Sequence, residues 1–536
     1  MSKNKFSYWN NILIVVLFYA GITGIITGLI LYLFRWLVSL LFEYSIMIYE
    51  YVSLNLWFIP LLLLGLALIA YVVSLLNKFE PTSAGGGIAR SIGVVRGLLT
   101  FKWLRTLIST FFAALFGTFV GLPLGIEGPS VLMGTATARG VYELGRAHPS
   151  NKKYILSAGT SAGFAVATGS IMAGTLFTLE EVHKKFSLML LSVSMSGAVF
   201  AALTVRFIDY LLDTSYLFFP IGDGLLTIDF EHIWLAPILG IGAGLLAYLY
   251  NFMMDHLGHL SVIKLKHIPL FIKYLINFTL VGLIGLLMIE SLGSGHEQVV
   301  LPLLNREYSL LVIGVLLLVK LFTIPLSAAA GPTGGMFVPT LVVGALYAGV
   351  FNEVAILLGL SPTYTTAIIM IGIAAFLGTS MQMPITVVAF IVETSLHPET
   401  IIFMMIAVFA GILTAEALHT KPLNEITLKR FMKVADRDRI WHLYQVQGTI
   451  LPDAFVVGKT VRDVLWPANT LIKELVQDDQ MNITNVAVHG GDRVLAQNDR
   501  VVFMIQSYNI NAVIEDLNAL LGNQNFSIEE QSLIIK

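Results

Sequence analysis

Gly-Ile-Glu-Gly-Pro-Ser-Val-Leu-Met-Gly at residues 125–134 returns in outline 210 positions later, as Gly-Met-Phe-Val-Pro-Thr-Leu-Val-Val-Gly at 335–344. The two glycines and the proline hold the same places in both copies. A second pair follows at nearly the same separation, because Phe-x-x-Glu at 177–180 is matched by Phe-x-x-Glu at 390–393. Two matched pairs in the same order predict an internal duplication, which is the sequence trace of a repeat-built membrane transporter, often with inverted topology.

The composition around these repeats is typical of a membrane protein. Of 536 residues, 56% are hydrophobic and only 12% are charged, whereas about a quarter of the residues of a soluble domain are charged. Several apolar stretches reach the ~17–25 residues that cross hydrocarbon. The sequence therefore predicts a polytopic α-helical membrane protein in a lipid bilayer. The stretches are 11–34, 57–76, 103–122, 187–204, 234–250, 272–289, 309–325, 340–358 and 364–377.

Several classes of function are excluded by what the sequence lacks. The stretch 11–34 is too long for a signal peptide and has no small-residue cleavage site, so we expect a retained helix. A net charge of −2 gives no reason to expect a nucleic acid partner. The absence of cysteine excludes disulfides, thiolate metal sites and cysteine catalysis. With neither His-Glu-x-x-His nor a Walker loop, we expect no enzyme activity, no metal and no cofactor.

The apolar pattern stops near His419, and an ordinary soluble composition follows. We therefore predict a transmembrane domain at 1–430 and a small α+β cytoplasmic domain at 431–536. In the second domain the pattern predicts strands at 455–457, 485–488 and 500–505, turns at 490–492 and 497–499, and an amphipathic helix at 509–521. Basic residues crowd 421–433 and the extreme N-terminus, so both termini are expected to be cytoplasmic.

Glycine and proline cluster at four places otherwise surrounded by apolar sequence, at 81–89, 121–129, 331–335 and 419–424. Broken backbone leaves amides that hydrocarbon cannot satisfy, so it persists at membrane depth where it lines a cavity. Helix N-termini that point into such a cavity favour an anion. The alternative is that each cluster is an ordinary loop at the membrane surface. The matching repeat positions of 121–129 and 331–339 favour an ion site there.

Ionisable side chains within apolar stretches are costly and are usually functional. A carboxylate at Glu127, among amides that favour an anion, would occupy the anion's own place and leave only when protonated or displaced. It therefore predicts a gate coupled to pH. For Glu180 and Glu393 a salt bridge at the membrane edge is the favoured interpretation, and Glu181 remains open. Lys320 is a further candidate, for which snorkelling to the interface is the alternative.

These motifs together resemble those of the CLC family of chloride channels and chloride/proton antiporters. Residues 125–129 resemble its Gly-x-Glu-Gly-Pro signature, and residues 335–339 resemble its Gly-x-Phe-x-Pro signature. The loop 85–89 stands in the place of its Gly-Ser-Gly-Ile-Pro loop, and 421–424 in the place of its Lys-Pro-Leu-Tyr segment. The resemblance covers roughly residues 15–430, and it implies the inverted-repeat CLC fold with broken helices.

The resemblance implies a proton-coupled chloride antiporter that moves chloride and protons across a bacterial plasma membrane as a homodimer. It makes Glu127 the external gating glutamate. Glu181 matches the internal proton-transfer glutamate, which is found in exchangers and is generally absent from the channel branch. The anion would be coordinated by backbone amides of Ile126, Gly128, Met336 and Phe337.

Two departures from the family pattern keep a second function open. Family members usually place a serine and a tyrosine hydroxyl at the central anion site, where this chain has Gly86 and Asn424. One donor is lost, although an asparagine amide can still donate. A passive anion channel of the same fold, with altered selectivity, is therefore the alternative to an antiporter.

The C-terminal part resembles the RCK-C (TrkA-C) regulatory domains of potassium channels, on residues 458–462, 490–492 and 498–500. The resemblance implies a paired regulatory domain that binds a small ligand, often a nucleotide. The basic candidates for that ligand are Lys459, Arg462, Arg493 and Arg500. The alternative for each of them is a solvated surface charge.

Overall fold

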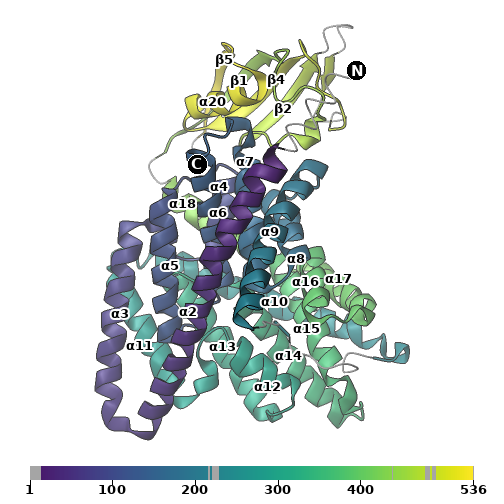
Figure 1. Ribbon diagram of the computed structural model, residues 1–536. Coiled ribbons are helices and arrows are strands. Elements are labelled where there is room, and N and C mark those ends of the chain that lie inside the picture. Colours follow the sequence, from purple (N-terminus) through teal and green to yellow (C-terminus); the bar gives the residue numbers. More distant parts are fainter. Residues whose placement is uncertain are drawn as a thin grey trace.

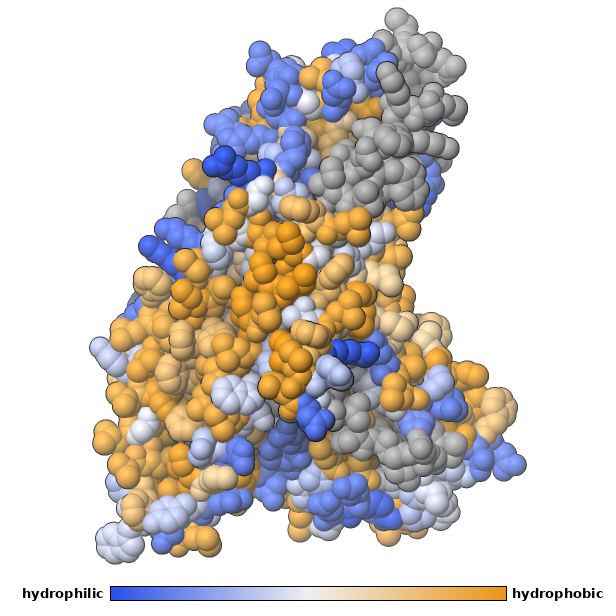
Figure 2. All heavy atoms as spheres, in the orientation of Figure 1, coloured by the Kyte–Doolittle hydropathy of each residue, from blue (hydrophilic) through white to orange (hydrophobic). Residues whose placement is uncertain are grey.

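The computed structural model describes residues 14–214, 218–219, 228–436, 439–476, 483–485 and 491–534. Long helices form one body, and a small domain with a sheet, here called the tail, sits at one end of it (Figure 1). Hydrophobic side chains cover much of the helical body, and hydrophilic ones gather over the tail (Figure 2). This distribution fits a helical body that lies in a bilayer and a tail that stands in water.

The first half of the helical body runs from the π-helix η1 (Ile14–Ala20) to α9. Several of its helices are separated by short 3₁₀ turns or breaks rather than by long loops. Its helices are α2 (Gly21–Leu54), α3 (Ile59–Phe79), α4 (Gly87–Val95), α5 (Trp103–Val120), α6 (Glu127–Leu144), α7 (Lys152–Thr168), α8 (Ile171–Phe177), the π-helix η5 (Thr178–His183) and α9 (Leu188–Leu212).

The second half follows the same plan and ends in a helix that leads to the tail. Its helices are α10 (Leu235–Ile263), α11 (Leu270–Leu287), the π-helix η8 (His296–Val300), α12 (Leu301–Leu304), α13 (Leu310–Ala330), α14 (Phe337–Leu357), α15 (Thr365–Met381), α16 (Pro384–Ser395), α17 (Ile401–Ala417) and α18 (Leu423–Ala435).

The helix ends repeat between the two halves, which confirms the duplication. Helices α5 and α13 both stop at a left-handed glycine, Gly121 with φ 81° and Gly331 with φ 92°. Helices α6 and α14 then begin at residues 127 and 337, so the separation of 210 residues is preserved. Helices α7 and α15 likewise stop before the left-handed residues Gly169 and Gln382.

The two halves are inverted with respect to each other, as an exchange of helix caps shows. Glu180, just after α8, accepts hydrogen bonds from the backbone N–H groups of residues 385–386 at the start of α16, at 3.1 and 2.7 Å. Glu393, near the end of α16, accepts from those of residues 171–172 at the start of α8, at 2.9 and 2.8 Å. The two elements therefore run antiparallel. The expected salt bridges are wrong, because both carboxylates cap helix N-termini instead.

Ten helices among the described residues are long and apolar enough to cross a membrane. Nine of them contain or overlap the nine predicted stretches, and the tenth, at Pro398–Ala417, was not predicted. Helices α6 and α7 are not among these ten, because they are rich in small residues of low hydropathy. A Cβ on Gly134 of α6 would overlap the carbonyl oxygen of Gly159 in α7, so the two backbones touch. Such close contact is typical of helices packed inside a membrane.

The tail is an antiparallel sheet with one helix, as its α+β prediction required. The strands have the order β3-β2-β4-β1-β5. The predicted strand at 500–505 and helix at 509–521 are confirmed as β4 and α20. The elements are β1 (Trp441–Thr449), β2 (Thr470–Val476), β3 (Ile483–Asn485), β4 (Arg500–Ser507), α20 (Ile510–Leu521) and β5 (Ser527–Ile534).

Other predictions for the tail fail or lie partly outside the described residues. The predicted strand at 455–457 is a turn, and its apolar side chains have another cause. Val456 is buried in the core of the tail, while Phe455 packs toward Tyr154 of α7 with ring centroids 6.2 Å apart. Of the predicted strand at 485–488, only Asn485, the last residue of β3, is among the described residues. Gly490 of the predicted turn also lies outside them.

The tail is docked directly on the helical body. The Tyr154 hydroxyl donates to the carbonyl of Asp463 at 3.0 Å, and the Lys185 ammonium donates to that of Val464 at 3.0 Å. The next residue, Leu465, is buried in one apolar cluster with Leu190 of α9. The segment 463–465 therefore lies against α7 and against the residues that follow η5, including the start of α9.

Candidate ion site

Three of the four glycine-rich breaks meet through their backbones. The N–H of Gly125 donates to the carbonyl of Gly335 at 2.9 Å, and the N–H of Gly335 donates back to Gly125 at 2.6 Å. The N–H of Gly334 points at the carbonyl of Gly85 at 3.4 Å. A Cβ on Gly128 would stand 2.7 Å from the Cα of Gly335, so side chains cannot enter this junction. The starts of α4, α6 and α14 are thereby brought together.

The fourth break, at 419–424, places α18 over the same junction. A Cβ on Gly86 would stand 3.4 Å from the Cγ2 of Thr427, and one on Gly85 would stand 3.0 Å from the ring of Phe431. The guanidinium of Arg90 lies 3.9 Å from the centroid of that ring. The structure therefore brings together all four breaks that the sequence singles out.

Glu127 is the first residue of α6 and is only 3% exposed. Its carboxylate lies at the backbone N–H groups of Glu127 itself and of Val338, the second residue of α14. The carboxylate folds back over Gly125, where an added Cβ would overlap Oε2. That Oε2 is buried and accepts no hydrogen bond from the described residues. A carboxyl group of the chain itself thus occupies the point where two helix N-termini converge.

Two cavities approach the junction. The far-side cavity, of about 340 Å³, is lined by Glu127, Ile126 and Val338, and further out by Arg35 and His296. The second cavity, of about 420 Å³, is called the tail-side cavity because Arg439 in its wall lies 4.0 Å from the ring centroid of Tyr508 in the tail. This cavity is lined at its inner end by Gly86, Gly334 and Met336.

The tail-side cavity is positively charged. Among the described residues that line it there are four cationic side chains and no carboxylate. Cations that face a cleft with low-dielectric walls raise the local concentration of anions. The cations are Arg90, Lys273, Arg430 and Arg439.

Glu181 lies in η5 and is 2% exposed. The Arg96 guanidinium holds the backbone of this turn, donating to the carbonyls of Glu181 at 2.8 Å and Val182 at 2.6 Å. The side chain of Asn424, at the start of α18, lies beside the Glu181 carboxylate. Of the remaining predicted residues, Gly86, Ile126 and Met336 precede α4, α6 and α14, Phe337 begins α14, and Gly128 is the second residue of α6.

The sequence model of the family described as "Voltage gated chloride channel" matches residues 65–416, which is well over half of the chain. The chain belongs to this CLC family. It is 27% identical to the "H(+)/Cl(-) exchange transporter ClcA" of Vibrio campbellii over 432 residues, which cover 78% of this chain and 90% of the relative. This CLC protein is therefore a multi-pass membrane protein of a family that transports ions.

Solved structures support the fold of this CLC chain. The structure of a slow cyanobacterial Cl⁻/H⁺ antiporter superposes with a TM-score of 0.71 and 21% identity, covering 79% of this chain and 99% of the other. A eukaryotic CLC transporter superposes with a TM-score of 0.64 and 16% identity, covering 78% and 74%. At these identities the likeness establishes the architecture of the helical body alone.

Lys320 of this CLC chain corrects one prediction. It does not snorkel, because it is fully buried in α13. Its ammonium donates to the carbonyls of Ser291 at 2.8 Å, Leu292 at 3.4 Å and Gly293 at 2.9 Å, which uses all three of its donors. Lys320 thereby fixes the loop that contributes Gly293 and Ser294 to the far-side cavity. A lysine in the middle of an apolar run is a signal that could have pointed to this role.

One hydrolase-like string in the CLC chain also needs an account. Residues 159–163 read Gly-Thr-Ser-Ala-Gly, which has the spacing of a serine nucleophile elbow. That motif works on a sharp turn between a strand and a helix. Here it lies within α7, where Ser161 is fully buried. The string therefore reflects close packing of small residues and gives no support to a hydrolase.

The basic candidates of the tail do not form one cluster of solvated charges. Lys459 is buried beneath Phe455, with its ammonium 2.8 Å from the ring centroid, and burial lowers its pKa to about 6. Arg462 pairs with Asp492 on the surface. The segments of Lys459 and Arg493 adjoin, since Val461 N–H donates to the carbonyl of Arg493 at 2.9 Å. Arg500 begins β4 and is exposed, opposite Thr449 and Val476.

Proposed function

We propose that this chain is a proton-coupled chloride antiporter. The observation that carries the proposal is the place of the Glu127 carboxylate, at the converging starts of α6 and α14. Helix N-termini favour an anion, and the carboxylate already occupies that position as a tethered anion. It opens the path when chloride displaces it or when it takes a proton. Because both ions act on one group, their movements are linked.

The anion is held mainly by backbone amides in this proposal. The amides of Met336 and Phe337 at the start of α14, and of Ile126 and Gly128 around the start of α6 once the gate is open, provide the donors. Gly86 adds no side chain, so Asn424 supplies the one side-chain donor at the central site. Support comes from the direct backbone contacts of these loops and from the two cavities that approach them.

Glu181 transfers protons between Glu127 and the tail side. Its support is its burial in η5, next to Arg96 and to the start of α18. A carboxylate in such a place is costly unless it has a function. The relatives that the chain matches are named H⁺/Cl⁻ exchange transporters, which further supports exchange over passive flow.

A passive anion channel is the second candidate, because Gly86 and Asn424 replace the usual hydroxyls. Flux measurements on the purified protein in liposomes separate the two functions. Under a chloride gradient, an exchanger drives protons uphill and the external pH changes, whereas a channel leaves protons at equilibrium. Empty liposomes give the leak. Chloride flux without uphill proton movement contradicts the antiporter and supports the channel.

The resemblance further supports a homodimer in a bacterial cell membrane, with both termini on the cytoplasmic side. The start of the described chain and the tail lie at one end of the body, since Ala20, Tyr154 and Leu465 share one apolar cluster. Exposed apolar side chains such as Met195 of α9 and Phe409 of α17 suit contact with lipid or with a second subunit. Light scattering in detergent distinguishes a dimer from a monomer.

In the same proposal the chain divides into the transport domain at 1–430 and a regulatory RCK-C domain at 431–536. The tail is an α+β unit with its own apolar core, which supports a separate domain. A nucleotide is the proposed ligand, with Lys459, Arg462 and Arg493 on adjoining segments as candidates for its phosphates and Arg500 on β4 as the fourth. Calorimetry with nucleotides, cyclic dinucleotides among them, tests this role.

A further inference from the structure

The start of α18 carries a buried amide whose N–H groups have no acceptor in the part of the chain that the structure describes. Asn424 is 5% exposed, and its Nδ2 donates to none of the described residues. The side chain lies beside the carboxylate of Glu181, yet the amide does not meet hydrogen-bond geometry there. A buried donor left without an acceptor costs about 1–3 kcal/mol. Such a group calls for a partner that the described residues do not supply, such as a water molecule or a bound ion.

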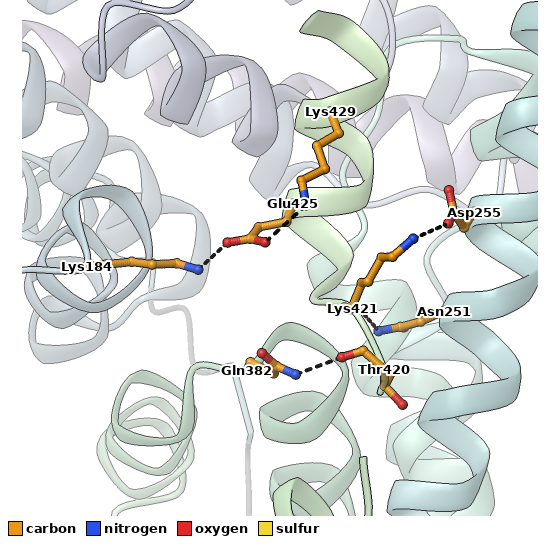
Figure 3. A network of polar contacts seen from close by, with 8 residues as sticks. All are labelled: Lys184, Asn251, Asp255, Gln382, Thr420, Lys421, Glu425 and Lys429. Carbon is orange, nitrogen blue, oxygen red and sulfur yellow. Dashed lines mark hydrogen bonds and ion pairs between the residues drawn. The ribbon is translucent and has the colours of Figure 1, made fainter. Parts of the chain in front are cut away.

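A polar network fixes this part of the chain in place (Figure 3). Glu425, the neighbour of Asn424, pairs with Lys184 just after η5 and lies 4.0 Å from Lys429 one turn on. Before α18 begins, Asn251 of α10 donates to the carbonyl of Lys421 at 2.9 Å. The remaining contacts of the network are Lys421 to Asp255 at 3.4 Å and Gln382 to the carbonyl of Thr420 at 3.1 Å. The backbone at Asn424 is therefore held in place by contacts of its neighbours with α10 and with the residue that follows η5.

The same face of α18 also borders the anion path. Residues three apart lie on one side of a helix, so Thr427 is on the side of Asn424. Thr427 faces Gly86, because a Cβ on Gly86 would contact its methyl group at 3.4 Å. Gly86 and Thr427 both line the tail-side cavity. Asn424 thus lies beside the Glu181 carboxylate, on the same side of α18 as Thr427, which lines that cavity.

We propose that the Asn424 amide is shared between Glu181 and the transported anion, and that this exchange links the two ions on the tail side. The inference rests on the antiporter proposed above. While Glu181 is ionised, its carboxylate attracts the amide N–H groups. Once Glu181 is protonated that attraction falls, and the amide turns its donors to the anion at the central site. By reciprocity, an anion bound to the amide favours protonation of Glu181.

Other charged groups near Glu181 bear on the same equilibrium. Arg96 from the end of α4 and Lys184 just after η5 favour the ionised carboxylate, while Glu425 from α18 opposes it. Behind η5, His183 contacts Ser157 of α7 at 2.7 Å, and Lys153 lies on the same side. Arginine ordinarily keeps its charge between pH 5 and 8. Substitution of Glu181 itself therefore separates its titration from that of His183.

Chloride calorimetry on the full-length protein in detergent, between pH 5.5 and 8, tests the proposal. Every variant carries Glu127→Gln, because the titration of Glu127 itself would otherwise change anion affinity. The Glu127→Gln protein without further changes is the parent. Its chloride affinity should rise as the pH falls, by tenfold or more, which corresponds to one hydrogen bond to a charged group. Adding Glu181→Gln should hold the affinity at its low-pH value at every pH.

Adding Asn424→Leu, which has a similar size but no donor, should hold the affinity at the parent's high-pH value at every pH. Adding Glu425→Gln in the same turn removes a charge but keeps the amide, so the pH dependence should remain, with a shifted midpoint. Asn424→Gln, made in the parent in place of Asn424→Leu, should keep part of the pH dependence that Asn424→Leu loses. Thermal melting and gel filtration establish that each variant is folded.

Two results would overturn the sharing of the amide. One is an unchanged pH dependence in the Asn424→Leu variant, which would show that the amide is not the link. The other is a loss of affinity in that variant well below the parent's high-pH value, which would make Asn424 an anion ligand at every pH. If the parent binds no chloride at any pH, the proposed anion site fails instead, so the two failures are distinguishable.

Discussion

Glu127 is held in the way that a bound anion would be held. Its carboxylate faces backbone N–H groups at the starts of α6 and α14, and one oxygen has no partner among the described residues. A hydrogen bond to a charged group is worth about 1.5–3 kcal/mol, so the N–H groups of Glu127 and Val338 can hold the carboxylate without making it immovable. Loss of its charge would remove most of this attraction, which is the physical basis of the gate proposed above.

We predict that Glu127→Gln abolishes proton movement and leaves chloride flux in place. Glutamine has nearly the shape of a protonated glutamate but cannot release a proton, so the gate stays in its neutral form. Chloride efflux from liposomes, recorded together with external pH, measures both ions. Uphill proton movement retained by this variant would show that another group carries the proton.

Glu181→Gln should also stop proton transport, for a different reason. Glutamine cannot relay a proton to Glu127, while chloride does not need the relay, so chloride flux should persist in the same liposome assay. Its neighbour Glu180 is the matched control. Glu180→Gln should keep coupled transport, and its thermal stability should fall by about 1 kcal/mol because the cap on α16 loses its charge. Reversed effects would show that Glu180 is the relay.

Gly86 can accept a side chain, which makes the missing hydroxyl testable. Its φ of −71° and ψ of 108° suit any residue, and an added Cβ would make only an ordinary 3.4 Å contact with Thr427. We predict that Gly86→Ser tightens chloride binding about tenfold by adding one hydrogen bond to a charged ligand. Gly86→Ala, which adds the Cβ without the hydroxyl, should show no gain in calorimetry. Equal affinities for both variants would mean that this loop does not face the anion.

At the scale of the elements, the sequence predicts the features that depend on local composition, namely the membrane helices and the breaks between them. Nine membrane helices are foreseen because hydrocarbon demands long apolar runs, and the four breaks are foreseen because glycine and proline mark them. Helix α7 is hidden from this reasoning, since every residue from Tyr154 to Thr168 is buried against protein and need not be strongly apolar. The omission of residues 398–417 has no such reason, because they meet the same criteria of length and hydropathy.

The remaining features of the site depend on contacts between segments far apart in the sequence, and no local sequence pattern predicts such contacts. The exchanged caps of Glu180 and Glu393 each join residues more than 200 positions apart. The placement of Asn424 beside Glu181 depends on how α18 packs against η5. The carbonyls around Lys320 come from a loop that the sequence does not connect with α13. The proposed roles of the site residues therefore depend on contacts that only the folded, inverted architecture brings together.

The turn at 455–463 of the tail offers a test of stability against pH. An exposed lysine has a pKa near 10.4, and burial lowers that of Lys459 to about 6. Between these values the unfolded tail binds a proton that the folded tail does not, so stability should rise with pH from about 6 upward. Lys459→Met should remove this slope. Pulse proteolysis of the tail at pH 6.5 and 8.5 measures it.

Arg462→Met is the control for this measurement. Arg462 belongs to the same turn, but its side chain is 54% exposed and pairs with Asp492 on the surface. Surface ion pairs contribute little to stability, so this variant should keep the wild-type slope. A slope that persists in Lys459→Met would show that Lys459 keeps its proton when the tail is folded.

At the scale of the whole molecule, two of the connections between the described tail and the helical body lie near Glu181 and η5. The first is covalent, through α18, which begins beside Glu181 and ends at the wall of the tail-side cavity. The second is the docking of residues 463–465 on Tyr154, Lys185 and α9. A ligand that moves the tail can therefore act on η5 from both sides. It regulates transport only if it binds two transport states unequally.

We predict that a chain ending at Arg439 still folds and exchanges chloride for protons, because no predicted ion-site residue lies beyond that point. It should lose any response to a cytoplasmic ligand such as a cyclic dinucleotide.

Leu465→Asp is the matched control: a charge in the buried cluster with Leu190 should undock an intact tail. That variant should still bind the ligand in calorimetry while its transport no longer responds. Liposome flux with and without ligand compares the three proteins. An inactive or monomeric truncated chain would make the tail a structural part of the transporter, and a ligand response retained by Leu465→Asp would leave α18 as the sole route of communication.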